Sequence, residues 1–345
     1  MDWFVVGFLL QDGLTAAAVY ALIAFSLVLI FSVTRVIFIG IGEFLSFAAL
    51  SLASLQLGAV PATVFLLIGL GIVTFLLLAW QAFVDKNTRI REKIWLEGIK
   101  LVLVPMFFYV ILSFYAPMQG HVLIDIALVL LLMLPFGGMI YRVFYQPIAE
   151  ASVLILLIFS VALHFALLGL GLLMFGPEGV RTQAITNVNI ELLGIPVSGQ
   201  AIFIGLVTLT LIVALWLFFT RALTGKVLQA TAINSRGANL VGVGNHEAGR
   251  LAFTLGIVLA VLCGAMLSPI ATVAYDTGFL IALKGFVAAI IGGLYSFPVA
   301  ALGALLVGIV EAYSAFWASA YKEIIVFTLI IPVLLWQSLN GKHHH

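Results

Sequence analysis

The chain has 345 residues, of which 64% are hydrophobic and 8% charged, with a net charge of +1 and a mean hydropathy of +1.28. Soluble globular domains carry about 25% charged residues, so the few charges here leave lipid as the solvent for most of the surface. The near-zero charge argues against nucleic acid as a partner, and the one cysteine, Cys263, excludes a disulfide framework and a cysteine-based metal site.

A helix that spans a bilayer needs about 20 mostly apolar residues. Ten stretches qualify, in chain order 13–33, 41–57, 61–84, 97–117, 122–141, 150–175, 199–220, 250–275, 298–317 and 322–338. An eleventh stretch, 279–294, is short and is interrupted by Lys284 and by glycines. We expect an all-α polytopic membrane protein with about ten transmembrane helices plus one short or broken helix. These form one domain over 1–341, and 342–345 are interpreted as the remnant of an expression tag.

The basic residues predict the orientation, because lysine and arginine accumulate in cytoplasmic loops. One loop holds Lys86, Arg89, Arg91 and Lys93, and the segment 221–250 holds or adjoins Arg221, Lys226, Arg236 and Arg250. In contrast, 176–198 carries one base, Arg181, against two acids. We therefore expect the basic loops inside, the N-terminus outside and the C-terminus inside.

The stretch "VTRVIFIGIGEF", residues 33–44, places Arg35 and Glu43 on either side of an apolar run that contains Gly40 and Gly42. Irregular backbone at membrane depth is tolerated where protein or a water-filled cavity satisfies it. Paired glycine-interrupted segments in the two halves of a transporter indicate the translocation site, and 36–46 and 283–297 are predicted to be such a pair. Glu43 either caps backbone amides or lines the pathway. Arg35 snorkels to the headgroups, or pairs with Glu43 if both lie deep.

The segment 221–250 is the one long connection on the basic side. Val227, Ala230, Asn234, Ala238 and Val241 recur at helical spacings, and Gly242 and Gly244 are placed to end a helix. An interfacial helix would carry bulky apolar anchors, which are few here. The pattern therefore favours a short cytoplasmic helix on which another protein docks.

This segment resembles the coupling helix of the permeases of bacterial branched-chain amino acid ABC importers. The family pattern A-x-A-x-N-x-x-x-A-x-L-x-G matches Ala230, Ala232, Asn234, Ala238, Leu240 and Gly242. The run "LKGFVAAIIGGLYSFPVAALGALLVGIVEA", 283–312, is similar to the family's K-x-F-x-A-A-x-x-G-G stretch and the helix that follows it. "YRVFYQPIAEASVLILLI" and "FGPEG" also resemble family segments, so the resemblance covers the first 55 residues and about 140–341.

Two departures from the family pattern matter. Residues 61–141 hold three spans where the family usually has one, which indicates an inserted helical pair at 85–141. The family's V-I-N-F-A-H-G-E is replaced by "VIFIGIGE", with Phe38 and Ile41 at its Asn and His positions. This change predicts an apolar pathway wall, unless these positions contact lipid or a neighbouring helix. The predicted pathway residues are Phe38, Gly40, Ile41, Gly42, Glu43, Lys284, Gly292 and Gly293.

No G-x-x-x-x-G-K-[ST] phosphate loop, catalytic constellation or metal cluster occurs, so we expect a transport subunit without enzymatic activity or cofactor of its own. His164 is expected to be a hydrogen-bonded interior histidine. The resemblance implies ATP and Mg²⁺ on separate cytoplasmic ATPase subunits, a second permease subunit, a periplasmic substrate-binding protein and a bacterial inner membrane. The implied cargo is a branched-chain amino acid or a related apolar or aromatic carboxylate. The alternatives are a stand-alone secondary transporter or channel, and a structural subunit without a pathway.

Overall fold

The computed structural model describes residues 3–84, 88–186, 188–192 and 195–340. Within these ranges, nine helical segments are long and apolar enough to cross a membrane, and two apolar helices are shorter. This architecture confirms the predicted all-α polytopic class. The long segments are α1 (Trp3–Thr34), α3 (Thr63–Val84), α4 (Thr88–Tyr115), α5 (Val122–Ile140), α6 (Val153–Phe175), α7 (Gly199–Arg221), α10 (Asn245–Leu267), α12 (Phe297–Trp317), and the run Ser319–Trp336, which includes α13 (Lys322–Thr328) and most of α14 (Ile330–Asn340).

The two shorter helices are α2 (Ile41–Gln56) and α11 (Thr277–Ile291). At 1.5 Å per residue they are about 24 and 22 Å long, less than the roughly 30 Å of a hydrocarbon core. The prediction of a full span at 41–57 is therefore wrong. Residues 35–40 form no helix and occupy part of the depth that a full span would need. The short helix expected within 279–294 is present as α11.

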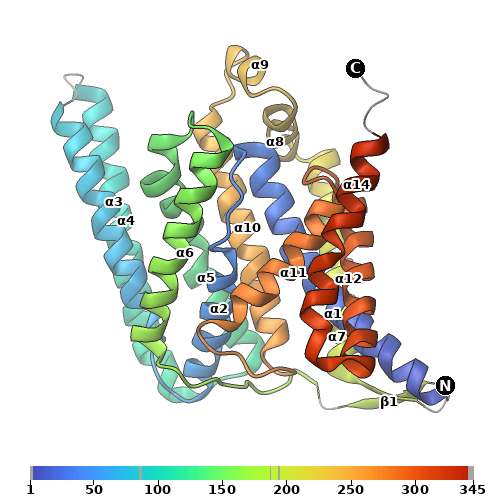
Figure 1. The fold of residues 1–345 in the computed structure, drawn as a ribbon. Helices are drawn as coiled ribbons and strands as arrows, with labels where there is room; N and C mark the ends of the chain where they lie inside the picture. The colour runs from blue at the N-terminus through green and yellow to red at the C-terminus, as the bar shows by residue number, and fades with distance from the viewer. Residues whose placement is uncertain (1–2, 85–87, 187, 193–194, 341–345) are drawn as a thin grey trace.

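The half-helices α2 and α11 lie in the middle of the bundle and run in opposite directions (Figure 1). α1 crosses to the upper end of the view, the chain descends through 35–40, and α2 continues downward. α10 descends beside them, and α11 returns upward after a loop. α10 contacts α1, α2 and α5, and α11 contacts α1, α2 and α12, so both half-helices are enclosed by protein.

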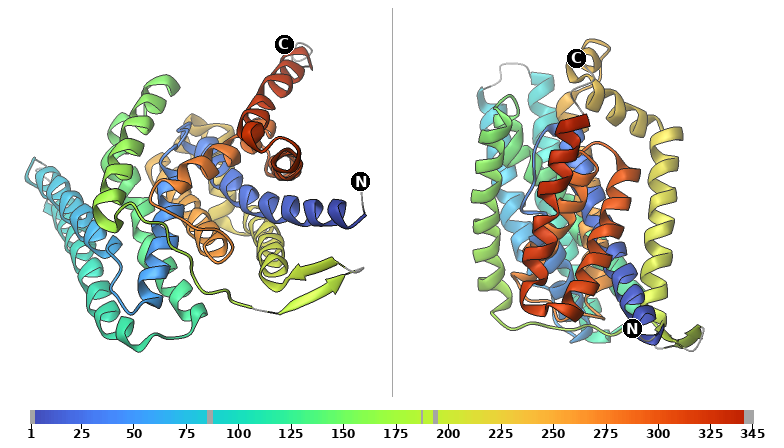
Figure 2. Two further views of the ribbon diagram at one scale, coloured as in Figure 1. Left: turned by 60° about the horizontal axis from the view of Figure 1, so that its bottom comes forward. Right: turned by 45° about the vertical axis from the view of Figure 1, so that its right-hand side comes forward.

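α3 and α4 form a pair at the edge of the molecule (Figures 1 and 2). They pack mainly on each other, and α5 packs against α10 and α2. The predicted insertion 85–141 combines α4 with α5, whereas the packing groups α4 with α3. Polar contacts also attach α4 to the rest of the chain: Arg142 Nη1 lies 3.2 Å from Glu97 Oε2, and the Tyr115 hydroxyl donates to Asp125 Oδ1 over 2.8 Å.

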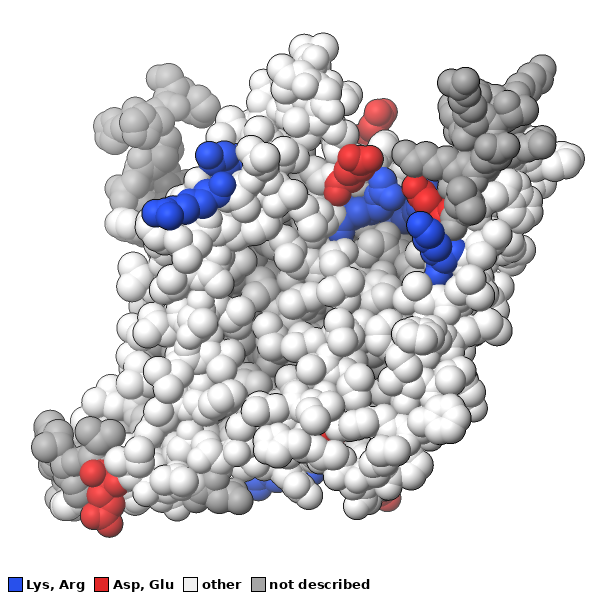
Figure 3. Space-filling view, turned by 180° about the vertical axis from the view of Figure 1, so that it is seen from behind, with Lys and Arg blue, Asp and Glu red and all other residues white. Residues whose placement is uncertain are grey.

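The charged side chains visible in Figure 3 gather at the two ends of the molecule, with an uncharged band between them. This distribution fits a slab of hydrocarbon around the band. The upper end in Figure 1 carries α8 (Leu223–Ile233) and α9 (Ser235–Leu240), and the lower end carries the hairpin of β1 (Asn189–Leu192) and β2 (Ile195–Ser198). The first described turn of α1 and the end of α14 lie at opposite ends.

Candidate functional site

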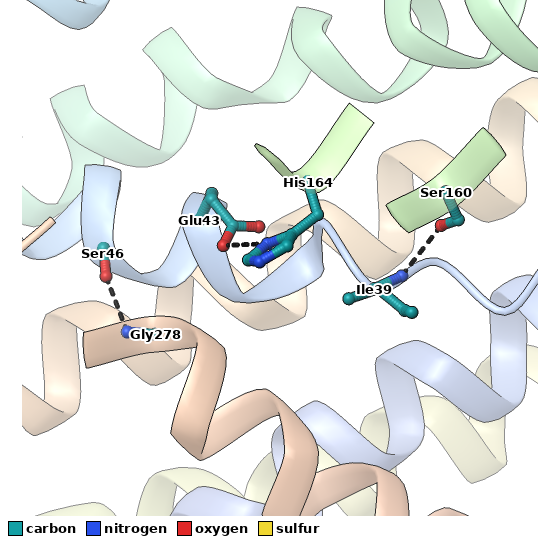
Figure 4. Close-up of polar contacts among 6 residues, drawn as sticks. All are labelled: Ile39, Glu43, Ser46, Ser160, His164 and Gly278. Carbon is teal, nitrogen blue, oxygen red and sulfur yellow. Dashed lines mark hydrogen bonds and ion pairs between the residues drawn. The ribbon is translucent and has the colours of Figure 1, made fainter. Parts of the chain in front are cut away.

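The N-terminal turns of α2 and α11 meet inside the bundle. The Gly278 amide donates to Ser46 Oγ over 2.9 Å, as Figure 4 shows. A Cβ added at Gly278 would lie 2.7 Å from the carbonyl carbon of Gly42 and closer still to its oxygen, and a Cβ at Gly42 would meet the Gly278 backbone in the same way. Only glycine allows the two backbones this close together. The crossing of the half-helices is therefore a direct consequence of these two residues.

The irregular stretch before α2 has partners for its backbone groups. The Ile39 amide donates to Ser160 Oγ on α6 over 3.0 Å (Figure 4), and the Tyr145 hydroxyl lies 3.1 Å from the same Ser160 oxygen. Non-helical backbone survives at membrane depth when protein groups satisfy it in this way.

Glu43, in the first turn of α2, is fully buried. Its Oε1 lies 2.7 Å from His164 Nδ1 on α6, and the imidazole stacks on the Phe279 ring at 4.4 Å between centroids. The other oxygen, Oε2, has no hydrogen-bond partner among the described residues. The positive end of the α2 dipole favours a carboxylate at this position. Through the hydrogen bond and the stacked ring, Glu43 and His164 connect α2, α6 and α11.

Arg35 and Glu43 do not pair, so that prediction is wrong. Arg35 follows α1 in a left-handed conformation, with φ 62°, and its amide donates to the Phe31 carbonyl. Its guanidinium donates to the Tyr295 hydroxyl and, over 3.2 Å, to the Ala232 carbonyl. The two residues lie at opposite ends of the stretch 36–42 and bond different partners, because the chain turns away from α1 at Arg35 and reaches α2 only deeper in the bundle.

Phe38 and Ile41 are fully buried and do not contact lipid in the isolated chain. The Phe38 ring packs against Phe44, Tyr145 and Phe253. Both residues border a cavity of about 270 Å³ whose other lining residues are all apolar and come from α1, α6, α11 and the 37–39 stretch. This position fits an apolar wall, and the packing of Phe38 on Phe253 of α10 also fits the alternative of contact with a neighbouring helix, so its use by cargo stays a prediction.

Lys284 is directed elsewhere. Its Nζ lies 2.6 Å from Glu311 Oε1 on α12, and Glu311 Oε2 accepts from the Tyr20 hydroxyl on α1. The Lys284 and Glu311 side chains are 8% and 14% exposed. This network joins three helices, and it occupies the ammonium that was predicted to line the pathway.

Gly292 and Gly293 end α11 at the other end of that helix, where Gly293 takes φ 63°. The closest backbone contact of 36–46 is therefore with 277–279. Of the predicted partner 283–297, Leu283 and Phe286 line the same cavity as Phe38 and Ile41, whereas Gly292 and Gly293 lie at the other end of α11. The residues that sequence reasoning missed are Ser46, Ser160 and Gly278. His164 is an interior histidine with a hydrogen-bond partner, as expected, but 121 positions separate it from Glu43 and no sequence spacing links them.

The predicted docking helix is two helices. Asn234 separates α8 from α9, and its Oδ1 accepts from the Gly237 amide over 2.9 Å as an N-cap. Ala238 is buried, whereas Ala230, Asn234, Leu240 and Gly242 are exposed. The segment also presents bulky apolar side chains, with Ile233, Leu240 and Val241 each at least 80% exposed. Few bulky apolar side chains were expected here, and the tip instead presents three of them among exposed polar residues.

Half-helices that meet within an all-helical membrane protein are typical of transport proteins. The family described as the permease component of branched-chain amino acid transport systems matches residues 9–334, and the chain belongs to this family. It is a multi-pass membrane protein.

The regions that match curated relatives cover about two thirds of each relative's length. The chain is 31% identical over 209 residues to the high-affinity branched-chain amino acid permease protein BraD of Pseudomonas aeruginosa, covering 59% of this chain and 68% of the relative. It is 30% identical over 207 residues to LivH of Escherichia coli, covering 58% and 67%. It is 27% identical over 217 residues to a probable LivH of Methanocaldococcus jannaschii, covering 57% and 67%. No solved structure matches.

Proposed function

We propose that the chain is a permease subunit of an ATP-driven (ABC) importer for branched-chain amino acids or related small apolar or aromatic carboxylates. The observation that carries the proposal is the crossing of α2 and α11 beside an apolar cavity. Discontinuous helices of this kind surround substrate sites in transporters. The similarity to high-affinity branched-chain amino acid permeases supports the cargo class.

The composition of the cavity supports an apolar side chain on the cargo. Its lining, which includes Phe38, Ile41, Phe279 and Phe286, offers apolar area and no exposed polar atom. Such a wall binds by area and does not read hydrogen bonds. Branched aliphatic and aromatic side chains fit this chemistry, and sugars and polar amino acids do not.

The tip of the α8–α9 segment supports docking of a cytoplasmic ATPase subunit. Ile233, Leu240 and Val241 are each at least 80% exposed, yet they lie beside bases rather than in the uncharged band. Exposed aliphatic groups at a polar end of a membrane protein indicate a protein interface. The ATPase would carry ATP and Mg²⁺, and a second permease subunit and a periplasmic binding protein complete the proposed importer.

The same bases support a bacterial inner-membrane orientation with the α8–α9 end in the cytoplasm. Arg221, Lys226, Arg236 and Arg250 belong to this end, whereas Arg181 lies in the connection beside the β-hairpin at the other end. The positive-inside rule then puts the N-terminus in the periplasm and the C-terminus in the cytoplasm.

A second candidate function is a stand-alone, proton-coupled transporter. The buried Glu43–His164 pair favours it, because intramembrane acid–histidine pairs occur in proton relays. This class needs no docked ATPase. The two functions therefore differ in whether an ATPase binds α8–α9.

A mild-detergent pull-down of the tagged chain from its native membrane, read by mass spectrometry, tests the proposal. We expect a P-loop ATPase with wild type and its loss with Leu240→Asp and Val241→Asp, which place a charge on the docking surface without disturbing buried groups. Ala238→Trp is a poor probe, because Ala238 is buried and the indole ring would disrupt the packing of α9 as well as any docking.

Leu57→Asp is the matched control, since Leu57 is 75% exposed and directly follows α2, whose C-terminal end lies at the lower end of the molecule in Figure 1. It should retain the ATPase. Absence of an ATPase with wild type, together with uptake that follows an imposed pH gradient, would favour the stand-alone transporter. Recovery of the ATPase with all three variants would refute docking on α8–α9.

A further inference from the structure

Arg35 links three parts of the chain: the end of α1, the end of α8, and the connection between α11 and α12. It follows the last residue of α1, its guanidinium donates to the carbonyl of Ala232 in the last turn of α8, and it also donates to the hydroxyl of Tyr295 between α11 and α12. The guanidinium carbon lies 5.0 Å from the centre of the Tyr295 ring. One residue therefore joins the α8–α9 segment to the stretch that leads into α2 and to the connection that follows α11.

The contact with α8 lies directly behind the proposed docking surface. Ala232 accepts from Arg35 on the inner side, and the next residue, Ile233, is 85% exposed on the outer side. The last carbonyls of a helix lack intrahelical partners, and the negative end of its dipole attracts a cation. A partner that displaces Ile233 must therefore move the Ala232 carbonyl relative to Arg35.

The contact on the other side leads to the half-helices. Arg35 itself begins the irregular stretch that continues into α2 and Glu43. Tyr295 directly follows Gly293 and Leu294, both left-handed, which end α11. The Tyr295 ring also packs against Phe31 in the last turn of α1, with 5.5 Å between ring centres. A shift of Arg35 thus reaches α2 through the backbone and α11 through Tyr295.

We propose that Arg35 is the positioning residue that transmits movement of the α8–α9 segment to the two half-helices. The inference rests on the proposed function, since the movement comes from a docked ATPase. The planar guanidinium is suited to this role, because its several donors bond a carbonyl and a hydroxyl at the same time and its carbon lies over the Tyr295 ring. A lysine ammonium lacks that fixed geometry.

The test uses the full importer reconstituted in vesicles, with cargo uptake and ATP hydrolysis measured on the same sample. Arg35→Met removes every donor but keeps a long side chain. We expect assembly with the ATPase to be retained, ATP hydrolysis within about twofold of wild type, and uptake per ATP reduced tenfold or more. Arg35→Lys should lie between Arg35→Met and wild type. Tyr295→Phe, which removes one acceptor and keeps the ring, should reduce the ratio less than Arg35→Met.

Lys100→Met is the control, because Lys100 is an exposed cation on α4, which packs on α3 and lies outside the docking segment 221–250. It should leave uptake per ATP unchanged. An unchanged ratio in Arg35→Met, or a proportional fall of uptake and hydrolysis together, would overturn the role of Arg35. Failure of wild type to bind an ATPase would overturn the proposed function as well, so the two failures are distinguishable.

Discussion

Gly278→Ala tests whether the backbone contact between α2 and α11 holds the site together. The new methyl group would lie 2.7 Å from the carbonyl carbon of Gly42 and from Ser46 Oγ. The obstacle includes backbone, so rotation of a side chain cannot relieve it. The Gly42 oxygen would lie closer still, so the half-helices must separate by more than about 1 Å before all of these contacts reach an ordinary distance of about 3.5 Å.

The cost has two parts. Overpacking of a close contact costs about 1–3 kcal/mol. The separation also lengthens the 2.9 Å hydrogen bond from Gly278 to Ser46, which is worth about 1 kcal/mol. We therefore expect Gly278→Ala to lower the free energy of unfolding by about 2–4 kcal/mol. Ser46→Ala adds no steric clash but leaves the buried Gly278 amide without an acceptor, so it should cost about 1–3 kcal/mol.

The assay is the thermal midpoint of the purified chain in detergent, followed by cargo uptake in vesicles that contain equal amounts of folded protein. Gly169→Ala is the matched control, since a Cβ at Gly169 on α6 meets nothing within 4 Å. Alanine is the better helix former, so the control should be neutral or more stable by about 0.5–1 kcal/mol. If Gly278→Ala matches Gly169→Ala in stability and uptake, the close crossing does not support the site.

Two further predictions concern buried side chains. His164→Leu leaves the Glu43 carboxyl without its 2.7 Å partner and should cost about 3 kcal/mol or more of the free energy of unfolding. Adding Glu43→Gln to this variant should recover part of the loss. If the effects of the two substitutions on thermal unfolding simply add, the pairing is contradicted. Phe38→Ala should cost about 3–5 kcal/mol, because the fully buried ring packs against three other rings, whereas an exposed ring such as Phe165 should tolerate the same change within about 1 kcal/mol.

The burial of Phe38 also changes how its proposed role can be tested. Restoring the family's residues with Phe38→Asn and Ile41→His would place polar groups in a fully buried, apolar site and disturb the aromatic packing. A change of cargo preference in such a variant would be confused with lost stability. Phe38→Leu keeps the site apolar and changes its shape, so it separates cargo choice from folding.

Sequence reasoning predicted what periodicity and hydropathy determine. The helical class, most span positions and the glycine-broken stretch near 36–42 follow from local composition, because a span must satisfy its own backbone. It failed at 41–57, where apolarity alone cannot distinguish a half-helix from a full span. The length of α2 depends on where α1 ends, and that depends on the left-handed Arg35 and its distant partners.

The choice of partners in the site was the other limit. Sequence analysis paired Arg35 with Glu43 on proximity, yet each bonds a residue more than 100 positions away. It also missed Gly278, because the motif glycines at 292–293 are more conspicuous, although Leu283 and Phe286 of the predicted segment do line the cavity beside Phe38 and Ile41. The direction in which α11 enters the bundle decides which end meets α2, and one sequence does not specify that direction.

Among the described residues, acidic and basic side chains inside the helix bundle pair with one another. Glu43 pairs with His164, and Lys284 pairs with Glu311, which also accepts from Tyr20. The cavity beside α2 is left to apolar groups, and an apolar pocket discriminates a missing methylene by only about 10–200-fold. Recognition of the cargo's ammonium and carboxylate must then come from outside this cavity. In the proposed importer that task falls to the binding protein, and the permease provides a path that tolerates related apolar side chains.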